Sequence, residues 1–124
     1  MRIFKTKLFT KRAAKEGVTD KILINAVNEM EQGLVYANLG GHVYKKRVAL
    51  KGRGKSGSAR TLLAYQVADK AFFIYGFMKN EKENLSGKEL KALKLLAEGL
   101  LSYSHQKLQE AINDGELKEV KYHE

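Results

Sequence analysis

The feature that most constrains the fold of this chain is an unbroken apolar and aromatic run at positions 71–77, Ala-Phe-Phe-Ile-Tyr-Gly-Phe. Aromatic and β-branched residues in a continuous run of this kind are typical of a strand that is buried on both faces. We therefore expect this segment to be a central strand of a sheet.

Two segments that precede this run are expected to join it in the sheet. Residues 43–50 alternate as a strand does, with Tyr44, Lys46, Val48 and Leu50 on one face and Val43, Lys45, Arg47 and Ala49 on the other. Residues 59–68 are compatible with a helix or a strand. Asp69 and Lys70 leave only a short connection to the apolar run, which favours a β-hairpin.

Two helices are expected near the N-terminus. The first covers residues 7–16 and ends at Gly17, a residue type that is common just after a helix. The second follows Thr19 as its N-cap and runs to about Gln32, with its apolar residues at helical spacing. The short polar connection predicts an N-terminal helical hairpin.

Helix returns in the last third of the chain. Ser86 and Glu89 have the spacing of a capping box and precede an apolar stripe at helical intervals. A last helical piece is expected at residues 106–113, followed by a charged tail. The predicted fold class is α+β, with the helical hairpin and a C-terminal helix packed on a small, mainly antiparallel sheet. A chain of 124 residues suits one domain, spanning residues 1–124.

Composition excludes several kinds of chemistry. The chain has no cysteine, so it forms no disulfide, no zinc–thiolate site and no thiol nucleophile. Its three histidines are scattered without ligand spacing, and we expect neither a metal site nor a cofactor. Neither a secretory signal nor an apolar run of membrane-spanning length is visible, which predicts a cytoplasmic protein with no membrane partner.

Positive charge is concentrated in one region. The net charge is +9, and residues 1–80 hold 16 Lys and Arg against 5 Asp and Glu. Between positions 44 and 61 there are seven cations and no acid: Lys45, Lys46, Arg47, Lys51, Arg53, Lys55 and Arg60. Solvated surfaces normally mix both signs, so this cluster favours a polyanionic partner over a merely soluble basic face. A membrane surface fits less well, because the cations flank a glycine-rich loop and not an amphipathic helix.

The glycine-rich loop at positions 52–58, Gly-Arg-Gly-Lys-Ser-Gly-Ser, invites comparison with a phosphate-binding P-loop. The first glycine of that motif falls on Ala49, and the later apolar strand is not followed by the aspartate that would hold magnesium. A nucleotide triphosphatase is therefore disfavoured. The loop still predicts a phosphate cradle, because its backbone N–H groups and the charges of Arg53 and Lys55 attract anions.

Lysine and arginine alone are chemically sufficient for RNA cleavage. RNA carries its own nucleophile, the 2′-hydroxyl, which has to be placed in line with the phosphate while fixed cations stabilise the developing charge. A lysine that is desolvated among other cations has a depressed pKa and can act as an acid or a base. The same cluster would also serve plain RNA binding, and the residues by themselves leave both open.

The sequence at positions 39–49, 52–61, 72–80 and 84–86 resembles the RelE/HigB-type toxins of bacterial toxin–antitoxin systems. Within them the chain is similar to a branch marked by a Gly-Lys-Ser-Gly loop, an Arg-Thr strand start and a Phe-x-Lys strand end. The resemblance implies a RelE-like, microbial-ribonuclease-like fold and cleavage of mRNA on the ribosome. It also implies neutralisation by a cognate antitoxin, in this branch often a helix-turn-helix protein.

The same resemblance implies roles for individual residues. Lys55 and Arg60 are expected to bind and stabilise the scissile phosphate, and Arg47 and Lys79 to complete the catalytic site. Further RNA contacts are expected from Lys45, Lys46, Lys51, Arg53 and Ser56. Two other functions stay open beside the endoribonuclease: a ParE-like inhibitor of DNA gyrase on the same scaffold, and a non-catalytic RNA-binding module.

Overall fold

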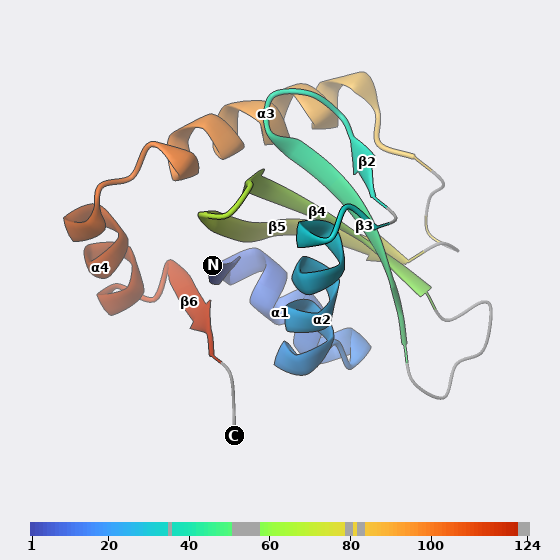
Figure 1. The fold of residues 1–124 in the computed structure, drawn as a ribbon, viewed down its shortest axis with the longest axis horizontal. Coiled ribbons are helices and arrows are strands. Elements are labelled where there is room, and N and C mark those ends of the chain that lie inside the picture. The colour runs from blue at the N-terminus through green and yellow to red at the C-terminus, as the bar shows by residue number, and fades with distance from the viewer. Residues whose placement is uncertain (35, 51–57, 79–80, 82–83, 122–124) are drawn as a thin grey trace.

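The computed structural model describes residues 1–34, 36–50, 58–78, 81 and 84–121. In this part of the chain, six strands form one mixed sheet with the order β2-β3-β4-β5-β1-β6. The strands are β1 (Arg2–Thr6), β2 (Ala37–Asn38), β3 (Val43–Ala49), β4 (Ser58–Gln66), β5 (Lys70–Met78) and β6 (Leu117–Val120). The helices are α1 (Lys7–Glu16), α2 (Asp20–Glu31), α3 (Gly87–Leu101) and α4 (His105–Asn113). Figure 1 shows the sheet with α3 above it and α1 and α2 below.

The apolar run lies where its composition predicts, in the interior of the sheet. β5 pairs antiparallel with β4 and parallel with β1, so it has a strand on either side. Its side chains alternate between two cores: Phe73 packs against Phe9 of α1, and Phe72 stacks on Phe4 with ring centroids 4.9 Å apart. The predicted central strand, the β4–β5 hairpin and the α+β class are confirmed.

The two N-terminal helices cover one face of the sheet. α1 begins at Thr6, whose hydroxyl accepts a hydrogen bond from the backbone of Phe9, and it ends at Gly17 in the left-handed conformation. α2 begins at Thr19 in the same way, as predicted. α1 packs on β5 while α2 packs on β3 and β6, and both contribute to one apolar core that includes Leu23 and Val27.

The C-terminal helices contribute to a second core on the opposite face. Ser86 and Glu89 form the predicted capping box, with the Ser86 hydroxyl and the Glu89 carboxylate each bound to the other residue's backbone N–H. Ala97 and Leu100 of α3 and Leu108 of α4 are buried with Phe72 in this core.

Both ends of the described chain differ from the sequence-based prediction. The segment after Gly115 was expected to be a charged tail, but residues 117–120 form β6, antiparallel to β1. β1 itself, which the sequence did not indicate, lies between β6 and β5. Each of these strands is short and half polar, so its pairing depends on the neighbouring strand more than on its own periodicity.

Candidate nucleic-acid interface

Arg47 and Arg60 face each other across two neighbouring strands. They are direct partners in the antiparallel register of β3 and β4, so their side chains leave the same face of the sheet. Arg47 is exposed and Arg60 is half-buried. Like charges placed directly opposite each other destabilise a sheet. The pair is therefore better explained by an anion that binds between the two guanidinium groups than by a contribution to folding.

Ser58 holds the guanidinium of Arg60. The Nη1–H of Arg60 donates to the hydroxyl oxygen of Ser58, at 3.1 Å. Ser58 is buried and precedes Arg60 by two residues, so both side chains lie on one face of β4. A guanidinium has five N–H donors, and this bond orients the group while leaving donors for an oxyanion.

A third cation extends the pair along β3. Lys45 precedes Arg47 by two residues and lies on the same face, opposite Leu62 of β4 and Ala37 of β2. A pocket of about 290 Å³ at this place is lined by Tyr36, Ala37, Lys45, Arg47 and Arg60. The described residues that line it include three cations and no carboxylate. We refer to it as the cationic pocket.

Lys46 lies on the other face of β3. Its ammonium group is 3.1 Å from a carboxylate oxygen of Glu29 in α2, and the residue is only 3% exposed. The Thr61 hydroxyl donates to the Lys46 backbone carbonyl on the same strand pair. The predicted alternation of residues 43–50 is thus confirmed, and it separates Lys46 from Lys45 and Arg47.

Comparison with known proteins identifies the family. The model of the family described as "RelE toxin of RelE / RelB toxin-antitoxin system" matches residues 1–120. The chain belongs to the RelE toxin family. This confirms the resemblance seen in the sequence, and membership implies an antitoxin as partner, within a family whose toxins are generally endoribonucleases. No curated protein and no solved structure gives a significant match.

Five of the residues predicted for this RelE-family toxin lie outside the described residues: Lys51, Arg53, Lys55, Ser56 and Lys79. The first four belong to the connection between β3 and β4. The last residue of β3, Ala49, and the first residue of β4, Ser58, are partners in the register. Lys79 follows Met78, whose partner is Ala59. In sequence, all five therefore adjoin the end of the sheet that carries Arg47 and Arg60.

Two residues of this candidate site were not singled out by the sequence analysis. Ser58 was placed in the loop, because the strand was expected to begin one residue later. The sequence analysis assigned no role to Tyr36, which lines the cationic pocket. A predicted strand that began at Ser58 would have placed Ser58 and Arg60 on the same face, because they are two residues apart. No pattern in the sequence indicates that Tyr36 lines a pocket.

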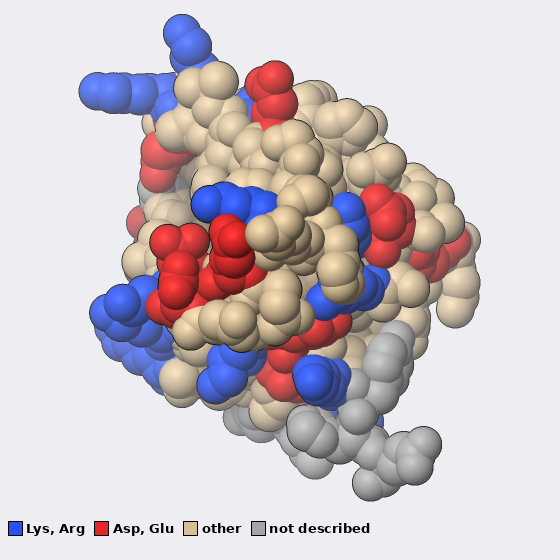
Figure 2. Space-filling model, turned by 90° about the vertical axis from the view of Figure 1, so that its left-hand side faces the viewer, with Lys and Arg blue, Asp and Glu red and all other residues tan. Residues whose placement is uncertain are grey.

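Another basic surface of the toxin mixes its charges. A pocket of about 580 Å³ between α1 and β6 is lined by Lys7, Lys11, Lys118 and Lys121 together with Glu119. Figure 2 shows the side of the molecule on which α4 and β6 lie, where basic and acidic side chains are neighbours. Mixed signs are typical of a solvated surface, so the cationic pocket is the stronger candidate for a nucleic-acid site.

None of the described helices is long and apolar enough to cross a membrane. Across the described residues, no group of three or more His, Cys, Asp or Glu side chains is arranged to hold a metal ion.

Proposed function

We propose that this RelE-family toxin inhibits translation by cleaving mRNA on the ribosome. The observation that carries the proposal is the cross-strand pair of Arg47 and Arg60 in a pocket that Lys45 also lines. A phosphate bound there would meet two guanidinium groups at once. Planar guanidinium groups contact two phosphate oxygens each, which suits them to a phosphorane whose equatorial oxygens carry the developing charge.

The reaction that fits these residues is attack by the RNA's own 2′-hydroxyl on the adjacent phosphorus. The P–O bond to the next nucleotide's 5′-oxygen breaks, and the 2′-hydroxyl proton is removed as that oxygen is protonated. Arg60, oriented by Ser58, would stabilise the phosphorane together with Arg47, while Lys45 binds a neighbouring phosphate. Lys55 and Lys79 are proposed to complete the catalytic site, and Lys46, Lys51, Arg53 and Ser56 remain predicted RNA contacts.

Dependence on the ribosome is consistent with the pocket's composition. Its described lining residues include no histidine and no carboxylate, the groups that most often transfer protons in catalysis. A site built from cations binds and polarises a phosphate, but it orders a flexible RNA strand poorly. We propose that the ribosome presents the mRNA in the reactive geometry, and that a cognate antitoxin, expected to be a helix-turn-helix protein, neutralises the toxin.

The test is to induce the toxin in a bacterial host and to map both mRNA ends and chromosome breaks. We expect growth arrest, mRNA cuts confined to translated regions, and recovery when the antitoxin is co-expressed. Arg60→Ala should abolish the cuts, while Lys118→Ala, which removes a cation at the far end of the sheet, should leave them. Double-strand DNA breaks with intact mRNA would select gyrase inhibition instead. RNA binding without any cut would select a non-catalytic module.

A further inference from the structure

Helix α3 presents apolar residues on two faces. Its inner face packs on the sheet through Ala97 and Leu100, which are buried in the second core. Its outer face carries four further apolar or small residues at helical spacing: Ala92, Leu95, Leu96 and Gly99. All four are exposed, and the exposed fractions of the two leucines are 65% and 42%. Figure 1 shows α3 on the outside of the fold, above the sheet. We call these four residues the outer stripe of α3.

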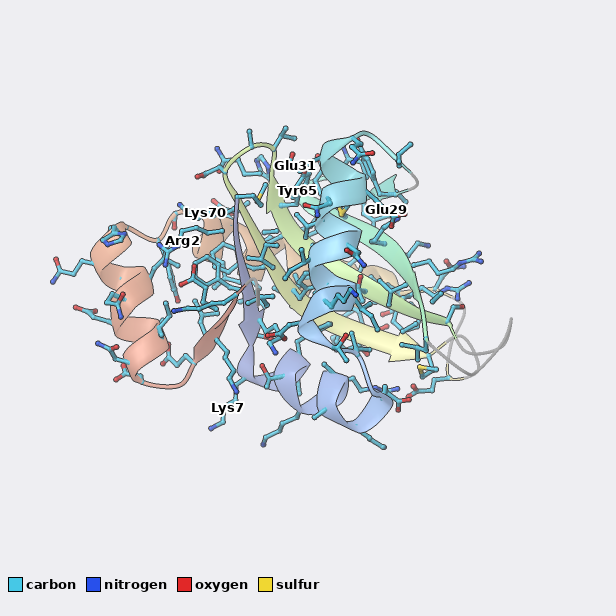
Figure 3. The ribbon with its side chains drawn as sticks, turned by 60° about the horizontal axis from the view of Figure 1, so that its bottom comes forward. Arg2, Lys7, Glu29, Glu31, Tyr65 and Lys70 are labelled. Carbon is cyan, nitrogen blue, oxygen red and sulfur yellow. The ribbon has the colours of Figure 1, made fainter. Side chains whose placement is uncertain are left out.

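The exposed faces of α2 and α4 are polar throughout, unlike that of α3. The exposed residues of α2 are Lys21, Asn25, Asn28, Glu29 and Glu31. Two of their carboxylates contact the strands: Glu31 accepts from the Tyr65 hydroxyl at 2.7 Å, and Glu29 lies 3.1 Å from the ammonium group of Lys46. Figure 3 shows Glu31 beside Tyr65. A surface helix normally has its apolar residues on the buried side alone. The outer stripe therefore needs another explanation than packing within this chain.

Gly99 supports this view, because the packing of the chain does not require a glycine there. A glycine in the interior of a helix is less favourable than an alanine. A Cβ atom at Gly99 would have no described residue within 4 Å, so the space beside it is open. The distance between two packed helices depends on the size of the side chains at their contact. Gly99 and Ala92, at the two ends of the outer stripe, leave room for a second helix to lie on the leucines between them.

Three lysines lie beside the outer stripe. Lys88, Lys91 and Lys94 follow one another at intervals of three residues, and none of them forms an ion pair with another described residue. Like charges one turn apart weaken a helix, and a cation in the first turn, where Lys88 lies, opposes the helix dipole. The row of lysines is therefore better explained by carboxylates of a partner than by the stability of α3.

A pocket connects the lysines to the outer stripe. It has a volume of about 410 Å³, lies between α3 and the connection from β2 to β3, and is lined by Gly41, His42, Lys91, Lys94, Leu95 and Glu98. The stem of Lys94 packs closely on this connection, since a Cβ atom at Gly41 would be 2.9 Å from the Lys94 Cγ. A partner side chain that enters the pocket meets the apolar surface of Leu95 and two ammonium groups together.

We propose that the outer face of α3 docks an amphipathic helix of the cognate antitoxin. Apolar residues of that helix pack on Leu95 and Leu96, and its carboxylates pair with the row of lysines. The docking site rests on the proposed function in one respect, because it takes an antitoxin as the partner. A second copy of the toxin fits this face less well, because both copies carry a net charge of +9 and the same lysines would meet.

The docked antitoxin lies on the same side of the sheet as the cationic pocket. Leu62 of β4 is buried in the core under α3, and Arg60 precedes it by two residues on the same face. A partner that covers α3 therefore obstructs the approach of the ribosome to this side of the sheet. It does so without any direct contact with Arg47 or Arg60.

The experiment measures binding of the antitoxin to variants of the full-length toxin. The probe is the product of the gene next to the toxin gene, titrated by calorimetry. Leu95→Glu places a charge in the apolar contact, so Kd should rise by at least about 30-fold, as for the loss of one interface hot spot. Leu8→Glu is the matched control and should leave Kd unchanged. Leu8 is 64% exposed, like Leu95, and belongs to α1, which packs on the opposite face of the sheet.

Gly99→Gln separates docking from folding, because its two effects have opposite signs. Replacing a helical glycine should raise the temperature of thermal unfolding. The added side chain should prevent the close approach of a second helix, so Kd should rise by at least about tenfold. Lys91→Glu tests the charges: its Kd should be larger than that of the wild type and less sensitive to salt.

Thermal unfolding of each variant shows whether it is folded. Wild-type affinity in folded Leu95→Glu and Gly99→Gln would overturn the docking proposal, and so would a wild-type toxin that does not bind the antitoxin. Without antitoxin, these variants should cut mRNA as the wild type does. The proposed function has a separate outcome, since it fails if the wild-type toxin cuts no mRNA, whichever surface the antitoxin covers.

Discussion

Arg2 of β1 and Glu119 of β6 form a bidentate ion pair, although they are 117 positions apart in the sequence. The Arg2 Nε–H donates to one carboxylate oxygen and the Nη2–H to the other, both at 3.0 Å. The guanidinium also lies 4.9 Å from the centroid of the Phe4 ring. This pair joins the first strand of the chain to the last one, at the edge of the sheet opposite the cationic pocket.

The pair predicts a dependence of stability on pH. The hydrogen bond from Arg2 lowers the pKa of Glu119 below its usual value, against a smaller opposing effect of burial. A carboxylate whose pKa is lower in the folded than in the unfolded state stabilises the fold above the unfolded pKa, and this stabilisation is lost as pH falls through the folded pKa. Glu119→Gln should cost roughly 0.5–1 kcal/mol of unfolding free energy at neutral pH, since both groups are partly solvated.

Urea unfolding of wild type and Glu119→Gln between pH 7 and pH 3 measures this effect. The difference between the two should shrink toward the acid end. Glu98→Gln, a change at an exposed residue of α3, is the control and should alter neither stability nor its pH dependence. A difference that is constant over the whole pH range would show that the Glu119 charge contributes nothing to the fold.

Arg47 and Arg60 are expected to oppose stability while supporting activity. Arg47→Gln removes one of two like charges at directly opposite positions of neighbouring strands, so the unfolding free energy should rise by roughly 0.2–1 kcal/mol. The rate of mRNA cleavage should fall by about 10²- to 10³-fold, as for loss of a group that stabilises a transition-state oxyanion. Chemical denaturation and a cleavage assay with translating ribosomes measure the two quantities. A variant that is both less stable and fully active would contradict the assignment.

Ser58 is expected to act on the reaction through Arg60. Ser58→Ala removes the acceptor that orients the guanidinium, and cleavage should fall by roughly tenfold, the value of one hydrogen bond to a charged group. Ser58→Thr keeps the hydroxyl and should recover most of the rate. Binding of single-stranded RNA at low salt should change little in either variant, because the charge of Arg60 is retained. Equal cleavage by the alanine and threonine variants would show that the hydroxyl has no positioning role.

Lys45 and Lys46 are adjacent, and their exchange for glutamine should have different consequences. Lys45→Gln removes a cation from the pocket, so the salt dependence of RNA binding should weaken by about 0.7 in the slope of log affinity against log salt concentration. Lys46→Gln breaks the ion pair with Glu29 under α2, and we expect lower thermal stability with an unchanged slope. The predicted RNA contact by Lys46 would be supported instead if its variant lowered the slope as much as the Lys45 variant.

Some features of this protein follow from short stretches of sequence. The apolar run predicts β5, because a strand that is buried on both faces has no alternation of polar and apolar residues. Helices begin at Thr6, Thr19 and Ser86, because each hydroxyl accepts a hydrogen bond from the backbone three residues later. Alternation within β3 separated Lys46 from Arg47 because the side chains of a strand point to opposite faces in turn. The excess of cations between positions 44 and 61 is a property of the composition alone, so it can be recognised without any knowledge of the fold.

Other features were decided by the tertiary structure, because they depend on which distant segments become neighbours. β1 and β6 are too short and too polar to be recognised alone. β1 is a strand because it pairs with β5 on one side and with β6 on the other, and Arg2 and Glu119 join β1 to β6. The partnership of Arg47 with Arg60 depends on the register of β3 and β4, which the packing of both faces determines and no local pattern specifies. The contacts of the Tyr36, Tyr44 and Tyr65 rings depend on the fold in the same way. The sequence shows which residue types a phosphate site could use. That Arg47 and Arg60 share one face of the sheet is decided by strand pairing between segments that are distant in the sequence.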